Sequence, residues 1–383
     1  METTPSKPDS PQPPRRWRFR FSLRTLLIAM PILAVLLGWV GNEKRKHDRE
    51  TGARESLTGK FQARWFVING PDAYEPKSGL FPVAPYWLAL GTPATTLPPF
   101  QPEDWETIGK LHSLQQLSLA SYEGPADGPT FSQVSQIDRL TLRNGLLTPN
   151  DLQQINELPR LKELTLDADY LRTPAQNSGE PPLNEMAQLV VRPQSWPELT
   201  SITLLNIELT DEALDGLSQL PALHSLHAFG CDLNGRALDK LANASQLRIL
   251  TYHPYNRDQT GKHVGTLPGR SVDQQTLALW GRMPRLYKLW LADMSLEGFG
   301  GAGGDLAGRW PSLGDLHLQE IELSATAVRE IAAMPKLTEL TLYACPVDPD
   351  AQETLDKLAS RIQVKIESAA QGVRIVKKPR NMP

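Results

Sequence analysis

One glycine-rich segment of this 383-residue chain has spacing that could bind a dinucleotide. Residues 298–303 satisfy the G-x-G-x-x-G pattern, and Glu320 follows about twenty residues later, where a dinucleotide fold carries an acid. That pattern requires its glycines directly after a strand. Here they begin seven residues after Leu291, the last apolar residue of the nearest strand pattern. A flexible insertion between two repeated units, on the convex side of a curved molecule, explains the segment better. No cofactor is therefore expected.

Histidines, acids and aromatic residues offer a second kind of chemistry. His227, His253 and His317 supply three imidazoles, and Asp315 lies two residues before the last of them. Imidazole and carboxylate groups transfer protons or bind zinc when the fold brings them together. By contrast, the sequence context places no serine or cysteine nucleophile beside a base. Whether these groups meet depends on the elements that carry them.

A repeated apolar pattern identifies those elements. From about residue 100, an apolar residue is followed at +3 and +5 by two more, in ten copies that end at Ile366. Four intervals between copies are 24 residues and one is 23, and the longer ones are 24 plus an insertion. The nine clear copies begin at Leu114, Ile137, Leu161, Leu199, Leu223, Leu247, Leu286, Leu313 and Leu337. The L-x-L alternation indicates a short strand, and the stretch before each next copy has helical spacing.

No single unit can bury its own apolar side, so the units must stack into a curved solenoid. The pattern L-x-x-L-x-L with this period resembles the leucine-rich-repeat family over residues 100–366. The resemblance implies an α/β horseshoe, with a parallel sheet on its concave face, helices on its convex face, and a surface used to bind proteins. The Arg-rich start, which reads Phe21-Ser22-Leu23-Arg24-Thr25-Leu26-Leu27, also resembles the membrane anchors of bacterial repeat proteins.

The position after each strand departs from the family's usual asparagine. It holds Gly145, Asp169, Ile207, Cys231, Met294, Ile321 and Cys345. An asparagine ladder is therefore not expected. The two cysteines lie four units apart, about 19 Å at the spacing of parallel strands, which is too far for a disulfide. We expect both to be reduced core residues.

Strand alternation turns the residues between the repeat leucines toward the concave face. In neighbouring strands this places one group of aromatic and charged side chains together, with Lys288 and Asp315 expected as a cross-strand ion pair. A long insertion follows His253, and its base carries two further candidates. The predicted protein-binding residues are His227, Phe229, His253, Tyr255, Arg257, Lys288, Trp290, Asp315 and His317.

Exposed aromatic side chains beside a few charges are typical of a binding hot spot. A large concave sheet also exposes some aromatic residues without any function. No metal site is expected, because His227 and His317 lie three strands apart, about 14 Å. The alternative functions are an enzyme with a site at His227, His253 and Asp315, and a structural envelope component.

The N-terminal region has the composition of a tail followed by an anchor. Residues 1–20 are rich in proline and arginine and are expected to be disordered. Residues 21–41 contain seventeen uncharged residues in a row, flanked by Trp17 and Trp39, and are expected to form a transmembrane anchor. A cleaved signal peptide and a buried soluble helix are the alternatives. Five arginines before the run against four basic residues after it slightly favour a repeat domain outside the cytoplasm.

The other expected boundaries follow from composition. Residues 42–60 form a charged linker, residues 61–100 an N-terminal cap, residues 101–367 the repeat domain, and residues 368–383 a disordered basic tail. Within the cap, a strand is expected near Trp65 and a short helix near Trp87.

The charge balance argues against nucleic acid as a binding partner. Forty basic and 43 acidic residues leave a formal charge of −3, without the basic excess of a dedicated nucleic-acid binder. The chain is thus expected to be a non-enzymatic, single-pass membrane protein. It would bind another protein, with no nucleic acid and no small-molecule substrate.

Overall fold

The computed structural model describes most of the repeat domain and the helix that precedes it. The described residues are 23–61, 63–67, 86–90, 100–120, 122, 131–145, 149–168, 191, 196–205, 207, 209–231, 239–253, 274–292, 310–367 and 374–377.

The described strands form one 13-stranded sheet in which the strands follow one another in chain order. Its central eleven strands are parallel, and antiparallel strands close its two edges. The strands are β1 (Arg64–Val67), β2 (Tyr86–Leu90), β3 (Leu114–Ala120), β4 (Arg139–Gly145), β5 (Glu163–Ala168), β6 (Ser201–Leu205), β7 (Ser225–Phe229), β8 (Ile249–His253), β9 (Lys288–Ala292), β10 (Asp315–Gln319), β11 (Glu339–Tyr343), β12 (Gln363–Glu367) and β13 (Arg374–Lys377).

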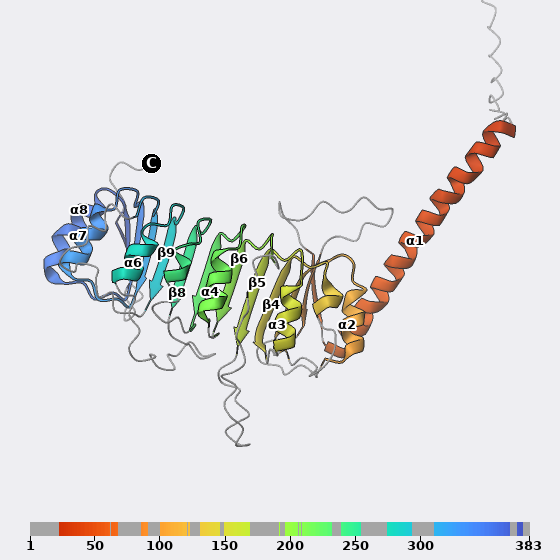
Figure 1. Ribbon diagram of the computed structural model, residues 1–383, viewed down its shortest axis with the longest axis horizontal. Coiled ribbons are helices and arrows are strands. Elements are labelled where there is room, and N and C mark those ends of the chain that lie inside the picture. The colour runs from red at the N-terminus through yellow and green to blue at the C-terminus, as the bar shows by residue number, and fades with distance from the viewer. Residues whose placement is uncertain are drawn as a thin grey trace, which may run out of the picture.

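Helices connect successive strands and lie along one face of the sheet (Figure 1). They are α2 (Pro102–Gly109), α3 (Pro149–Asn156), α4 (Asp211–Ser218), α6 (Gln274–Trp280), α7 (Ala325–Ala333) and α8 (Gln352–Ala359), with short 3-10 helices at Phe131–Val134 and Pro349–Ala351. The Thr210 side chain accepts a hydrogen bond from the backbone of Ala213 and so caps α4, as expected from Thr210-Asp211. Ser324 caps α7 in the same way.

The repeat leucines fill the space between the sheet and the helices. Leu289, Leu316 and Leu340 pair in register across β9, β10 and β11, and each is fully buried. The same arrangement continues through one hydrophobic core that runs the length of the stack. The predicted solenoid of stacked units is therefore confirmed, and its expected strands are β3 to β12.

Gly216 shows how tightly the outer layer packs. A Cβ atom at this position in α4 would lie 2.1 Å from the backbone oxygen of Val191. Only glycine permits this approach of the two backbones.

The turns after the strands use backbone geometry and cysteine in place of an asparagine ladder. Gly230, Glu320 and Ala344 each have a positive φ, between 50° and 62°, directly after β7, β10 and β11. The next residue is a cysteine after two of these strands. Cys231 Sγ lies 3.4 Å from the Leu204 oxygen, and Cys345 Sγ lies 3.2 Å from the Leu318 oxygen, so each thiol donates to the preceding strand.

Both cysteines are reduced thiols, as predicted; Cys231 is buried and Cys345 is half-buried. Burial raises the pKa of the Cys345 thiol to about 11. The thiol therefore stays protonated and available as a donor at neutral pH.

Two expectations at the ends of the sheet were wrong. Residues near Trp87 form strand β2 rather than a short helix, because Leu88 and Leu90 pair with Leu117 and Leu119 in the register of the repeats. The basic tail was expected to be disordered throughout, yet Arg374–Lys377 forms β13 along β12. The expected strand near Trp65 is present as β1. Both antiparallel strands satisfy backbone groups that a parallel stack would leave open at its edges.

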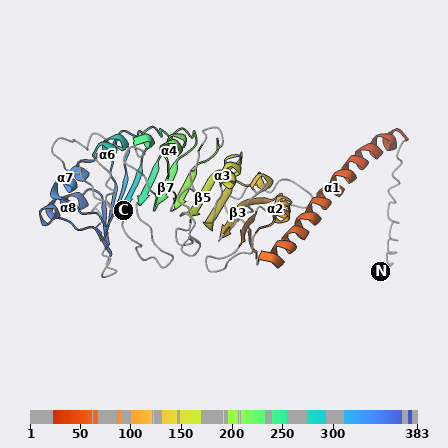
Figure 2. The same ribbon diagram turned by 60° about the horizontal axis from the view of Figure 1, so that its bottom comes forward.

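The N-terminal helix α1 (Leu23–Phe61) continues without a break through residues 42–60, which were expected to be a charged linker. The last turns of α1 pack against the N-terminal end of the repeat domain. Phe61 stacks on Phe100 with ring centroids 4.6 Å apart, and Lys60 Nζ lies 2.6 Å from Asp104 Oδ2. The first half of the helix projects away from the sheet (Figure 2).

The described part of α1 does not reach the combination of length and apolar character needed to cross a membrane, and neither does any other described helix. The expected anchor, residues 21–41, lies partly outside the described residues.

Candidate functional site

The candidate site lies on the front face of the sheet, defined as the face opposite α3, α4 and α6. Buried and partly exposed residues alternate along the strands, so the residues between the leucines point to this face. The pairing His227 to Thr251, Thr251 to Trp290 and Trp290 to His317 reproduces the column expected from the sequence.

Five aromatic rings form a continuous row across β7 to β10. This row, called the aromatic patch, consists of His227, Phe229, His253, Trp290 and His317. Successive ring centroids are 6.4 Å apart for His227 and Phe229, 5.0 Å for Phe229 and His253, 4.9 Å for His253 and Trp290, and 5.6 Å for Trp290 and His317. Edge-to-face contacts predominate in the middle of the row. Such contacts hold each ring in place before any ligand arrives.

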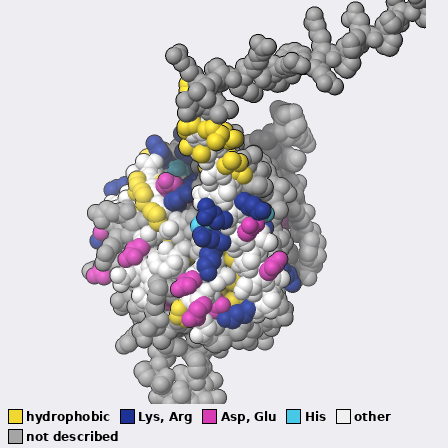
Figure 3. Space-filling model, turned by 90° about the vertical axis from the view of Figure 1, so that its right-hand side faces the viewer, with side chains coloured by type: hydrophobic (Ala, Val, Ile, Leu, Met, Phe, Trp, Pro, Cys, Tyr) yellow, Lys and Arg dark blue, Asp and Glu magenta, His cyan; other side chains and the backbone are white. Residues whose placement is uncertain are grey.

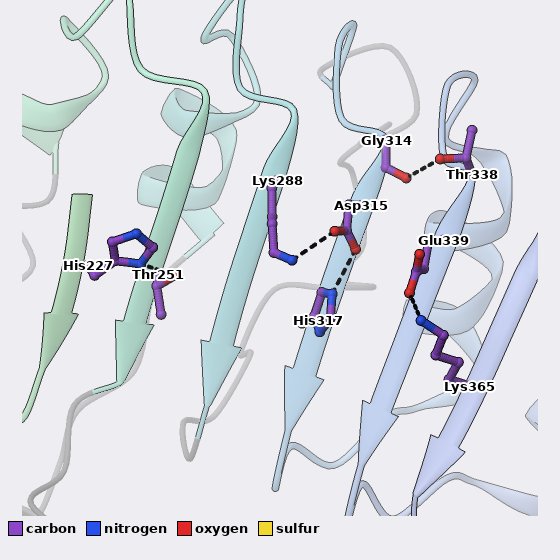
Figure 4. Close-up of polar contacts among 9 residues, drawn as sticks. All are labelled: His227, Thr251, Lys288, Gly314, Asp315, His317, Thr338, Glu339 and Lys365. Atoms are coloured by element: carbon purple, nitrogen blue, oxygen red, sulfur yellow. Dashed lines mark hydrogen bonds and ion pairs between the residues drawn. The ribbon is translucent and has the colours of Figure 1, made fainter. Parts of the chain in front are cut away.

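The ends of the row differ in their polar surroundings. His227 Nδ1 lies 2.9 Å from the Thr251 hydroxyl (Figure 4). Burial lowers the pKa of His227, and the charge of Lys288 lowers it further. His227 is therefore neutral at pH 7 and offers an uncharged ring.

The other end of the row carries a chain of charges. Lys288 Nζ lies 3.0 Å from Asp315 Oδ2, which confirms the expected ion pair. Asp315 Oδ1 lies 2.8 Å from His317 Nε2, and on the next strand Glu339 contacts Lys365 (Figure 4). Burial alone would raise the pKa of Asp315, but contacts with His317 and Lys288 outweigh burial and lower it. Asp315 is therefore ionised at neutral pH.

Some predicted residues are brought together and others are not. His227, Phe229, His253, Lys288, Trp290, Asp315 and His317 all lie on β7 to β10. Tyr255 and Arg257 lie outside the described residues, as do residues 298–303. His227 and Asp315 are separated by two intervening strands, so the catalytic trio considered above does not converge.

Two members of the charged chain, Glu339 and Lys365, were not among the predicted site residues. Glu339 occupies the column of Asp315, and Lys365 occupies that of His317. Lys365 lies in the last, degenerate copy of the repeat. Extending the columns by one strand would have found it.

Comparisons with known proteins give little further information. No family model and no curated protein matches the chain. Among solved structures, a leucine-rich-repeat protein of Leptospira interrogans is 18% identical, with 70% of this chain and 69% of that chain covered and a TM-score of 0.35. An internalin of Listeria monocytogenes is 14% identical, with 75% and 87% covered and a TM-score of 0.34.

Similarities this weak carry no argument about function. The architecture rests instead on the eleven parallel strands in register, the buried leucines and the helices along one face. On these observations the chain has the fold of a leucine-rich-repeat solenoid.

Proposed function

We propose that this chain is a non-enzymatic, membrane-tethered module that recognises another protein through the aromatic patch. The observation that carries the proposal is the row of five rings in mutual contact, of which His253 is buried and the other four are left partly accessible on a stacked sheet. Large, pre-positioned aromatic side chains supply most of the energy at protein interfaces. Because the rings are already ordered, binding costs little side-chain entropy.

The surroundings of the patch favour a protein partner over a small molecule. The rings lie in a row across four strands instead of converging on one point. Charged pairs border the row at Lys288 and Asp315, and at Glu339 and Lys365. An apolar centre with a charged border is the usual anatomy of a protein interface.

The tether is proposed for residues 21–41. From Ile28 to Trp39, the large apolar side chains of α1 that the structure describes are exposed by 43% to 72%. Figure 3 shows apolar side chains gathered on α1 with basic side chains next to them. An exposed apolar helix in water is unfavourable, and insertion into lipid would remove that cost. The repeat domain is proposed to lie outside the cytoplasm.

Crosslinking in intact cells tests recognition. We expect Trp290→Ala to reduce partner capture by about 30-fold, the equivalent of a 2 kcal/mol hot spot. The matched control is Thr165→Ala, which occupies the same column in β5 and should capture normally. Unchanged capture by both Trp290→Ala and Phe229→Ala would contradict the proposal, provided that both variants retain the wild-type melting temperature.

Membrane fractionation tests the tether separately. The full chain should stay with membranes in alkaline carbonate, and replacing Val35 and Leu36 with Lys should release it, because each central Lys costs about 3 kcal/mol in lipid. Lys46→Gln is the control. Protease added to intact cells should digest the repeat domain, whereas protection of that domain would reverse the proposed orientation.

A further inference from the structure

Three potential metal ligands converge beside the aromatic patch, on two neighbouring strands. Asp315 and His317 are two residues apart on β10, and Glu339 lies opposite Asp315 on β11. One ligand atom from each of the three lies within 4.8 Å of the other two. A divalent ion about 2 Å from each ligand atom places those atoms at most about 4 Å apart, so the three side chains would have to close in slightly around it.

Asp315 and His317 present two neighbouring potential ligand atoms. Asp315 Oδ1 and His317 Nε2 are 2.8 Å apart. Oδ1 is buried, and the His317 ring is the polar group that faces it. An ion bound by both atoms would replace this contact and keep the buried carboxylate oxygen paired.

Two lysines hold the carboxylates without using all their oxygens. Lys288 contacts Oδ2 of Asp315, and Lys365 contacts Oε1 of Glu339. The second oxygen of each carboxylate can still face an ion. Contacts of this kind orient metal ligands in known sites, although here the positive charges also oppose a cation.

We propose that Asp315, His317 and Glu339 form a binding site for a divalent transition-metal ion, with zinc as the best fit. One imidazole nitrogen and two carboxylate oxygens are ligands that zinc accepts, whereas magnesium and calcium prefer oxygen alone. Because the three ligands leave a fourth position open on the front face, a side chain of the bound partner can complete the coordination.

Titration of the purified full chain in detergent with zinc chloride, followed by calorimetry, tests the site without any partner. We expect one saturable equivalent in the wild type. His317→Gln, Asp315→Asn and Glu339→Gln should each weaken binding by at least about tenfold. Glu163→Gln should bind normally, since Glu163 is a carboxylate in the same column that pairs with Arg139 on β4.

Substitution of a neighbouring lysine should have the opposite effect on zinc affinity. Lys288→Met removes a positive charge next to Asp315 and should tighten zinc binding. Absence of saturable binding to the wild type would overturn the proposal, as would equal affinity in His317→Gln. Zinc should also raise the melting temperature of the wild type and not that of His317→Gln, which separates a lost site from a lost fold. Recognition through the aromatic patch is measured by crosslinking, so either proposal can fail alone.

Discussion

The two halves of the front face share one scaffold and differ in what they display. In β3 to β6 the central column reads Ser118, Thr141, Thr165 and Thr203, whereas in β7 to β10 it reads His227, Thr251, Trp290 and His317. The leucines behind both columns are equally buried. The stack therefore fixes positions along the face, and the residues between the leucines decide what each half can bind.

The largest expected effect is on stability, and it tests the leucine core that both halves share. Leu164 in β5 and Leu289 in β9 hold the same position in their repeats and are both buried. We expect Leu164→Ala and Leu289→Ala each to lower the free energy of unfolding by about 2–5 kcal/mol. Denaturant unfolding of the purified domain measures both. A large loss of stability for only one of the two variants would contradict the view that the two halves have equivalent cores.

The second prediction exchanges a front-face residue between the aromatic half and the polar half. Trp290→Thr gives β9 the residue type of β5, and we expect it to lose partner capture by about 30-fold without unfolding the chain. Thr165→Trp adds an exposed ring to the polar half and should leave capture unchanged. If Thr165→Trp abolished capture instead, the polar half would belong to the interface.

A smaller effect on stability is expected at the turns that follow β7 and β11. Ala344 has φ 50°, a conformation that costs a residue with a Cβ about 1 kcal/mol. Ala344→Gly should therefore raise the free energy of unfolding by up to about 1 kcal/mol, and Gly230→Ala should lower it by a similar amount. A thermal melt of each variant checks the two signs, and a destabilising Ala344→Gly would contradict the reasoning.

The smallest effect is the dependence of stability on pH through His227. Its pKa in the folded chain lies below the ordinary 6.5, so the unfolded chain binds a proton more readily. Stability should fall as the pH drops through about 6.5, and the loss should be complete below the lowered folded pKa. In melts between pH 7.5 and 5.5, His227→Gln should lose less stability than the wild type. An equal loss would remove His227 as the cause.

The period of the leucines was enough to predict the repeat strands and their register, because every copy repeats the same burial requirement. The columns of the front face followed from that register, including the pair of Lys288 and Asp315. The ends were harder to predict, since each occurs once and has no second copy for comparison. Leu88 and Leu90 form a single apolar pair behind two prolines, which resembled the start of a helix.

The candidate site was predicted in its aromatic members and in the pair of Lys288 and Asp315, whereas Glu339 and Lys365 were not chosen as site residues. A search for metal ligands among histidines alone rejected the pair His227 and His317, which lie three strands apart. The convergent group combines one of those histidines with two acids on adjacent strands. Side-chain direction brings Asp315 Oδ1 and His317 Nε2 together, and no spacing rule gives that direction.

The central claim is that the aromatic half of the front face touches a protein partner and the polar half does not. A photo-crosslinking amino acid placed at Phe229 or at Thr165 of the full chain, and activated in intact cells, measures this directly. The account predicts one defined crosslinked species from position 229 and none from position 165. Crosslinking from position 165 alone, or equal yields from both positions, would contradict it.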